Sequence, residues 1–159
     1  MLTGLSPDTT YDYSVGSTTE VMAGDDADHF FVTSPVVGTS KPTRMWVLGD
    51  SGTANANAAA VRDAYLGLND GVHTDFWLML GDNAYADGTD SQYQAAVFDM
   101  YARMLKKSVL CSTLGNHDGH TADSATPSGP YYEIFTLADC GGGGWIAVGH
   151  GGVLFIRVR

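Results

Sequence analysis

The stretch FWLMLGDNAY, residues 76–85, joins an apolar run to a polar turn, and the same arrangement occurs twice more in the chain. Residues 45–48 (MWVL) are followed by GDSG at 49–52, and residues 109–114 (VLCSTL) are followed by GNHD at 115–118. The three apolar runs are short and bounded by turn residues, which is typical of buried strands. Each polar motif therefore follows the carboxyl end of a predicted strand.

Helical periodicity separates these predicted strands. Apolar residues recur with a helical period over Ala58–Leu68 and again over Ser91–Lys107. Ser91, with Gln94 three residues later, predicts a capping box at the start of the second helix. The order β-α-β-α-β predicts a parallel α/β core with right-handed crossovers. Because the carboxyl ends of such strands line one crevice, we expect the oxygen and imidazole side chains of the three motifs to converge on a metal centre.

The composition limits the partners that the chain can bind. The 159 residues carry a formal net charge of -10 at pH 7, and 44% of them are hydrophobic. Binding to a nucleic-acid backbone is not expected, because it needs clustered Lys and Arg. No apolar run is long enough to span a membrane, and the first residues lack the pattern of a secretory signal. Cys111 and Cys140 provide no disulfide framework and do not fix the redox compartment.

The order of the three motifs resembles the calcineurin-like metallophosphoesterases, and among them the purple acid phosphatases. Many members of that superfamily place a metal-binding His two residues after the first Asp, where this chain has Gly52. Tyr85 follows the second Asp at the spacing that purple acid phosphatases use, so a phenolate replaces an imidazole as ligand. A phenolate suits a hard trivalent ion. Asp118 departs from the Glu that is common in purple acid phosphatases at that position.

The resemblance implies a dinuclear hydrolase of phosphate monoesters of the acid phosphatase type, in which a metal-bound hydroxide attacks phosphorus. It assigns Asp50 and Tyr85 to the first metal, Asp82 to a bridge between both metals, and Asn116 to the second metal. The implied ions are Fe(III) and a divalent ion, which is zinc, iron or manganese. His117 is implied as the catalytic residue that binds the phosphoryl oxygen or assists the leaving alkoxide. The implied partner is a small-molecule phosphate ester. The resemblance implies secretion or a periplasmic location, although the sequence itself leaves the location unknown.

Two alternatives to an acid phosphatase stay open. Each motif alone is more typical of a turn or a loop, and only their joint order favours the family. The first alternative is a metal-dependent phosphodiesterase or nucleotide hydrolase of the same superfamily. The second is a non-catalytic fragment that binds one cation through Asp50 and Asp82. The family's site includes three later histidines that this chain lacks, so we expect the chain by itself to be inactive. His29, His73 and His120 are more typical of loop residues than of ligands.

The two ends of the chain differ from the central part. We expect residues 1–40 to be a remnant of a fibronectin-type β domain plus a linker. Residues 2–15 contain the alternating pattern of a β-strand, and His29–Thr33 offers a partner strand. An independent β-hairpin is the alternative. Residues 41–159 then form the N-terminal half of a metallophosphoesterase sandwich.

The segment 137–159 lacks the family's pattern. Codons for residues 149–159 can be chosen so that reading one base later gives Gly-Thr-Gly-Ala-Tyr-Tyr-Ser-Phe-Glu-Tyr-Gly, which resembles a strand of the family. The hypothesis is that a single-base frameshift near residues 137–141 produced this tail. The alternative is a native strand, Gly152–Val158, that closes the sheet.

Overall fold

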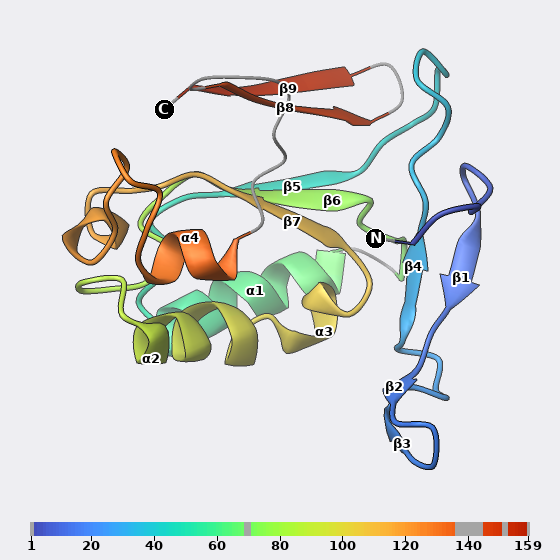
Figure 1. Ribbon diagram of the computed structural model, residues 1–159, viewed down its shortest axis with the longest axis horizontal. Helices are drawn as coiled ribbons and strands as arrows, with labels where there is room; N and C mark the ends of the chain where they lie inside the picture. Colours follow the sequence, from blue (N-terminus) through green and yellow to red (C-terminus); the bar gives the residue numbers. More distant parts are fainter. Residues whose placement is uncertain (1, 69–70, 136–144, 151–152, 159) are drawn as a thin grey trace.

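A parallel three-stranded sheet forms the centre of the chain (Figure 1). Its order is β5 (Met45–Leu48), β6 (Phe76–Met79) and β7 (Val109–Ser112), and the first residues of the three strands are in register. This computed structural model describes residues 2–68, 71–135, 145–150 and 153–158. The predicted parallel β-α-β-α-β core is confirmed, although only β6 is buried along most of its length.

The first crossover helix, α1 (Ala56–Leu68), begins at Ala56 rather than at the predicted Ala58. The second crossover differs from the single predicted helix Ser91–Lys107. It consists of α2 (Asp90–Tyr93), a π-helical segment (Gln94–Asp99) and α3 (Ala102–Leu105). Three core residues of this crossover, spaced four apart, are at most 2% exposed: Tyr93, Val97 and Tyr101. An α-helix has about 3.6 residues per turn, so side chains spaced four apart gradually move around its surface. A π-helical turn is wider, and it keeps these three side chains on one face.

The predicted capping box at Ser91 and Gln94 is wrong. The box lies two residues earlier, between Thr89 and Gln92. The Gln92 side chain accepts hydrogen bonds from the backbone N–H groups of Thr89 and Asp87, at 3.1 and 3.0 Å. It therefore ties the helix start to the loop that follows β6.

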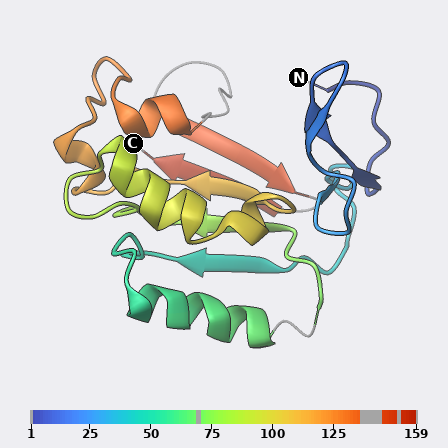
Figure 2. The ribbon, with the colours of Figure 1, turned by 90° about the horizontal axis from the view of Figure 1, so that it is seen from below.

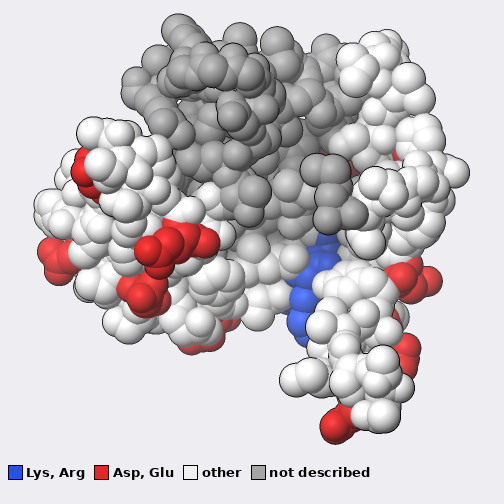
Figure 3. All heavy atoms as spheres, viewed as in Figure 1, with Lys and Arg blue, Asp and Glu red and all other residues white. Residues whose placement is uncertain are grey.

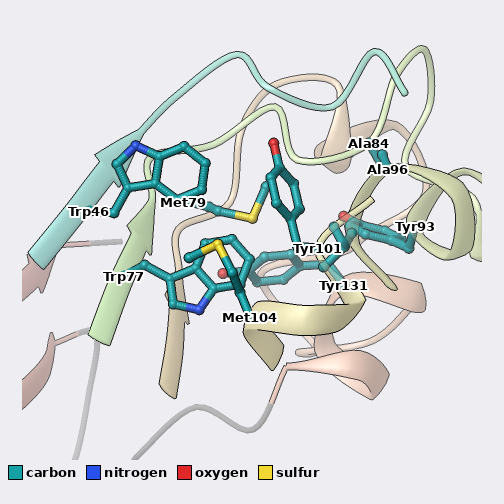
Figure 4. Packing of buried hydrophobic residues seen from close by; sticks show 10 residues of the cluster. Trp46, Trp77, Met79, Ala84, Tyr93, Ala96, Tyr101, Met104 and Tyr131 are labelled. Atoms are coloured by element: carbon teal, nitrogen blue, oxygen red, sulfur yellow. The ribbon is translucent and has the colours of Figure 1, made fainter. Parts of the chain in front are cut away.

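Aromatic side chains fill the space between the sheet and its crossover helices (Figure 4). Trp46 of β5 stacks on Tyr65 of α1, with ring centroids 4.3 Å apart. Trp77 of β6 meets Tyr101 edge-on at 5.1 Å. Large buried rings contribute much of the stability of a small domain. This core fixes the strand ends, and hence the loops that follow them.

A two-stranded hairpin follows α4 (Pro130–Ile134) in the chain. β8 (Trp145–His150) pairs antiparallel with β9 (Val153–Val158), and Figure 1 shows the hairpin on the side of the parallel sheet opposite α1 and α3. A strand close to the alternative Gly152–Val158 is therefore present, but it pairs with β8 in a separate sheet and does not close the parallel one. The proposed site of the frameshift, residues 137–141, lies outside the described residues.

The N-terminal strands form two small antiparallel pairs. β1 (Thr10–Asp12) pairs with β4 (Phe30–Val32), as predicted, and β2 (Val15–Gly16) pairs with β3 (Val21–Ala23). The fibronectin-type origin of this part and the division at residue 40 stay predictions. None of the helices in the described part of the chain has the length and hydrophobicity of a membrane span.

Figures 1 and 2 show the N-terminal strands beside α3 and one end of the parallel sheet. Contacts at Lys106 and Lys107 help to hold them there. The Tyr13 hydroxyl donates to the carbonyl oxygen of Lys106 at 2.9 Å. The Lys107 ammonium pairs with the Asp28 carboxylate and lies 5.2 Å from the centre of the Phe30 ring. Part of the segment predicted as a separate domain is therefore anchored to the central α/β unit.

Candidate metal centre

The loops that follow β5 and β6 are joined by main-chain hydrogen bonds. The backbone N–H of Asp50 donates to the carbonyl of Gly81 at 3.2 Å, and the N–H of Gly52 donates to the carbonyl of Asp82 at 3.0 Å. The N–H of Tyr85 returns a hydrogen bond to the carbonyl of Gly52 at 2.9 Å. The first two polar motifs therefore lie side by side at the carboxyl end of the sheet.

Gly52 makes this close approach feasible. A Cβ at this position would lie 2.6 Å from the carbonyl oxygen of Asn83, and closer still to two other main-chain atoms of Asn83 and Ala84. No side chain fits there unless the two loops separate. The absence of a His two residues after Asp50 therefore has a steric basis in this chain.

Three side-chain oxygens meet beside this contact. The Tyr85 hydroxyl donates to Asp50 Oδ1 at 2.7 Å and lies 3.1 Å from Asp82 Oδ2. The hydrogen bond to Asp50, together with burial and the Asp82 carboxylate, raises the pKa of Tyr85 well above its ordinary value. Both aspartates have a φ of 52°, a left-handed conformation that is uncommon for residues other than glycine.

Asp82 also connects the second motif to the third. Its Oδ1 accepts a hydrogen bond from the backbone N–H of His117 at 3.0 Å. Burial opposes ionisation of Asp82, but this hydrogen bond and the neighbouring Tyr85 hydroxyl hold its pKa below the usual range. Asp82 is thus an ionised, nearly buried carboxylate between two loops.

The third motif places His117 against Tyr85, with ring centroids 4.4 Å apart. His117 Nδ1 lies 2.6 Å from the carbonyl oxygen of Ala86. Because a carbonyl can only accept, the proton of the neutral ring is on Nδ1, and Nε2 is left for another partner. Asn116 is an exposed residue of the same turn.

Comparison with known families matches residues 43–158 to the calcineurin-like phosphoesterases. The chain belongs to this family. The match includes the whole parallel sheet and all three polar motifs. Comparison with curated proteins finds no match. Calcineurin-like phosphoesterases are metal-dependent, so the resemblance makes the chain a metal-dependent phosphoesterase of the hydrolase class.

The oxygen cluster of this phosphoesterase domain fits a hard cation. Asp50, Asp82 and Tyr85 offer two carboxylates and a phenol, and hard metal ions prefer oxygen ligands. Within the described ranges, however, no three His, Cys, Asp or Glu side chains gather in a metal-binding arrangement. The described residues therefore supply only part of the coordination that a metal ion needs.

Sequence reasoning missed two features next to the candidate metal centre. Asp118 is fully buried and accepts hydrogen bonds from the loop after β6 and from its own loop, although the sequence shows it only as the last residue of the third motif. His120 was expected to be a loop residue, and it lies in a short 3-10 turn, Asp118–His120. Its ring contacts that of His117, with centroids 5.4 Å apart, and its Nδ1 lies 3.1 Å from Asp87 Oδ1. The positions of both residues depend on how the loops fold together.

Proposed function

We propose that this phosphoesterase domain is of the purple acid phosphatase type, whose reaction is the hydrolysis of phosphate monoesters. The observation that carries the proposal is the Tyr85 hydroxyl placed between the carboxylates of Asp50 and Asp82. Deprotonated, these groups would hold a trivalent ion, while Asp82 and Asn116 would hold a divalent ion of zinc, iron or manganese. The close packing at Gly52, which leaves no room for an imidazole there, supports the phenolate ligand.

The bound ions would activate water and neutralise the negative charge of the phosphate group. The carbonyl of Ala86 holds the His117 ring through Nδ1, so Nε2 accepts a hydrogen bond when the ring is neutral. In the protonated ring, Nε2–H would donate to a phosphoryl oxygen or give its proton to the leaving alkoxide. The net charge of -10 favours cations over anions. On the face drawn in Figure 3, Asp and Glu are spread out while Lys and Arg form one small group. Attraction of an anionic substrate therefore depends on the charge of the bound metal.

We expect the chain by itself to bind one cation and to turn over little substrate. Two carboxylates, a phenolate and one amide are too few ligands for two ions, because each metal ion generally needs at least four ligands. This expectation follows from the absence of a third acidic, His or Cys ligand among the described residues. It keeps the non-catalytic alternative open for this chain.

Titration with Fe(III) tests the proposal. A phenolate on Fe(III) gives a purple colour through charge transfer, so visible absorbance is expected to rise with bound iron and to saturate. Tyr85→Phe should abolish the band, whereas Tyr11→Phe, a matched change in strand β1, should leave it unchanged. A colourless chain, or a band that persists in Tyr85→Phe, would contradict the proposal. Hydrolysis of a chromogenic phosphate monoester by the same samples shows whether the bound metal supports turnover.

A further inference from the structure

A fully buried carboxylate joins the loops that follow β6 and β7. Asp118 is 0% exposed. Its Oδ2 accepts hydrogen bonds from the backbone N–H of Gly115 at 2.8 Å and from Asn83 Nδ2 at 2.9 Å. The backbone N–H of Asn83 lies 3.2 Å from each carboxylate oxygen, and the Tyr93 hydroxyl donates to Oδ1 at 2.6 Å. Burial of a carboxylate is unfavourable unless donors surround it, and Asp118 meets that condition.

The partners of Asp118 flank the residues proposed as metal ligands. Asn83 directly follows Asp82, and Gly115 directly precedes Asn116. A Cβ on Gly115 would lie 2.9 Å from Asp82 Cα and closer still to two other Asp82 atoms, so the two loops are in direct contact. One carboxylate therefore fixes the main chain beside a proposed ligand on each loop.

The donors around Asp118 are themselves held in place. Asn83 gives its other amide N–H to the carbonyl of Thr113 at 2.8 Å, while its buried Oδ1 has no hydrogen-bond partner among the described residues. The two donated bonds thus determine the orientation of this amide. Burial and the Asp118 carboxylate raise the pKa of Tyr93, so its hydroxyl stays protonated and acts as a donor.

We propose that Asp118 is a positioning residue that sets the placement of Asp82 and Asn116 and thereby the metal affinity of the site. This inference rests on the proposed function, because it takes those two residues as metal ligands. Asp82 needs such support, since its left-handed backbone is costly for a residue other than glycine. An Asn side chain at position 118 would replace one carboxylate oxygen with an NH₂ group. The donor that faces this group would then have no acceptor.

The test compares Mn²⁺ affinity, measured by isothermal titration calorimetry, in the full chain and in Asp118→Asn. Loss of a hydrogen-bond partner behind a metal ligand commonly costs about 10- to 100-fold in affinity, so Asp118→Asn is expected to raise the Kd at least about tenfold. Asp123→Asn, a change of an exposed Asp in the next turn, is the matched control and should stay within about twofold. Near-UV circular dichroism verifies that each variant keeps native packing at the titration temperature.

If Asp118→Asn folds and binds Mn²⁺ as tightly as the unsubstituted chain, the positioning role is overturned. The proposed function is left intact by that result. Failure of the unsubstituted chain to bind Mn²⁺ would contradict the proposed function, and this inference with it. If Asp118→Asn does not fold, Tyr93→Phe replaces it, because that change removes one donor and keeps the carboxylate. Tyr93→Phe is expected to weaken Mn²⁺ binding roughly threefold, and unchanged affinity would overturn the inference.

Discussion

Gly52→Ala is expected to force apart the loops that carry Asp50 and Asp82. The added methyl group would lie 2.6 Å from the carbonyl oxygen of Asn83 and closer to two further main-chain atoms. Main-chain atoms cannot rotate away as the end of a flexible side chain can. The loops themselves must therefore move.

The cost can be estimated from the contacts that would be disturbed. Insertion of a methyl group into a packed position typically costs about 1–3 kcal/mol. Gly52 also makes two main-chain hydrogen bonds, to Asp82 at 3.0 Å and from Tyr85 at 2.9 Å, each worth about 1 kcal/mol. Loss of both together with the steric strain gives a decrease of about 3–5 kcal/mol in the free energy of unfolding.

Urea unfolding followed by tryptophan fluorescence measures this decrease. Gly67→Ala is the matched control, because the residue is in α1 and, apart from its chain neighbours and the backbone of its own helix, no described atom lies within 4 Å of the added Cβ. This control is expected to be neutral or to stabilise by up to about 1 kcal/mol. A loss below about 1 kcal/mol for Gly52→Ala would refute the argument that close loop packing requires glycine here.

Two further predictions concern the contact between the N-terminal strands and the α/β unit, where the His73 ring lies 5.5 Å from the Phe30 ring. Burial, opposed by the Asp75 carboxylate, lowers the pKa of His73, so the unfolded chain takes up a proton at a higher pH than the folded chain. The free energy of unfolding should therefore fall as the pH drops below about 6.5. Urea unfolding between pH 7.5 and 5.5 should show a shallower fall for His73→Gln than for the unsubstituted chain. Equal dependence of the free energy on pH in the two proteins would exclude this effect. Asp28→Ala removes the partner of Lys107 and should speed amide hydrogen exchange in residues 30–32. Asp25→Ala is the control variant. Equal exchange rates in the two variants would show that the ion pair does not hold the strands.

The parallel core could be predicted because its signals are local. Each strand is an apolar run that ends in a glycine-containing polar turn, and a helical period separates successive runs. The same pattern places the motifs at one edge of the sheet, and the structure brings Asp50, Asp82 and Tyr85 together there. The roles of these residues as metal ligands, and of Asn116 and His117 beside them, stay predictions.

Features that depend on tertiary packing could not be predicted. The π-helical turn at Gln94–Asp99 keeps three core side chains on one face, and the sequence alone does not specify that core. The helix cap lies at Thr89 because the Gln92 side chain also binds the backbone of the preceding loop. Besides the local donor Gly115, the buried Asp118 depends on Asn83 and Tyr93, which lie 35 and 25 residues away in the chain.

The most direct test of the metal centre is anomalous X-ray diffraction at the iron edge from crystals of the chain soaked in Fe(III). An anomalous peak is expected between the side-chain oxygens of Asp50, Asp82 and Tyr85. A peak elsewhere, for example in the acidic hollow lined by Asp25 and Asp26, or no peak, would contradict the assignment of this site.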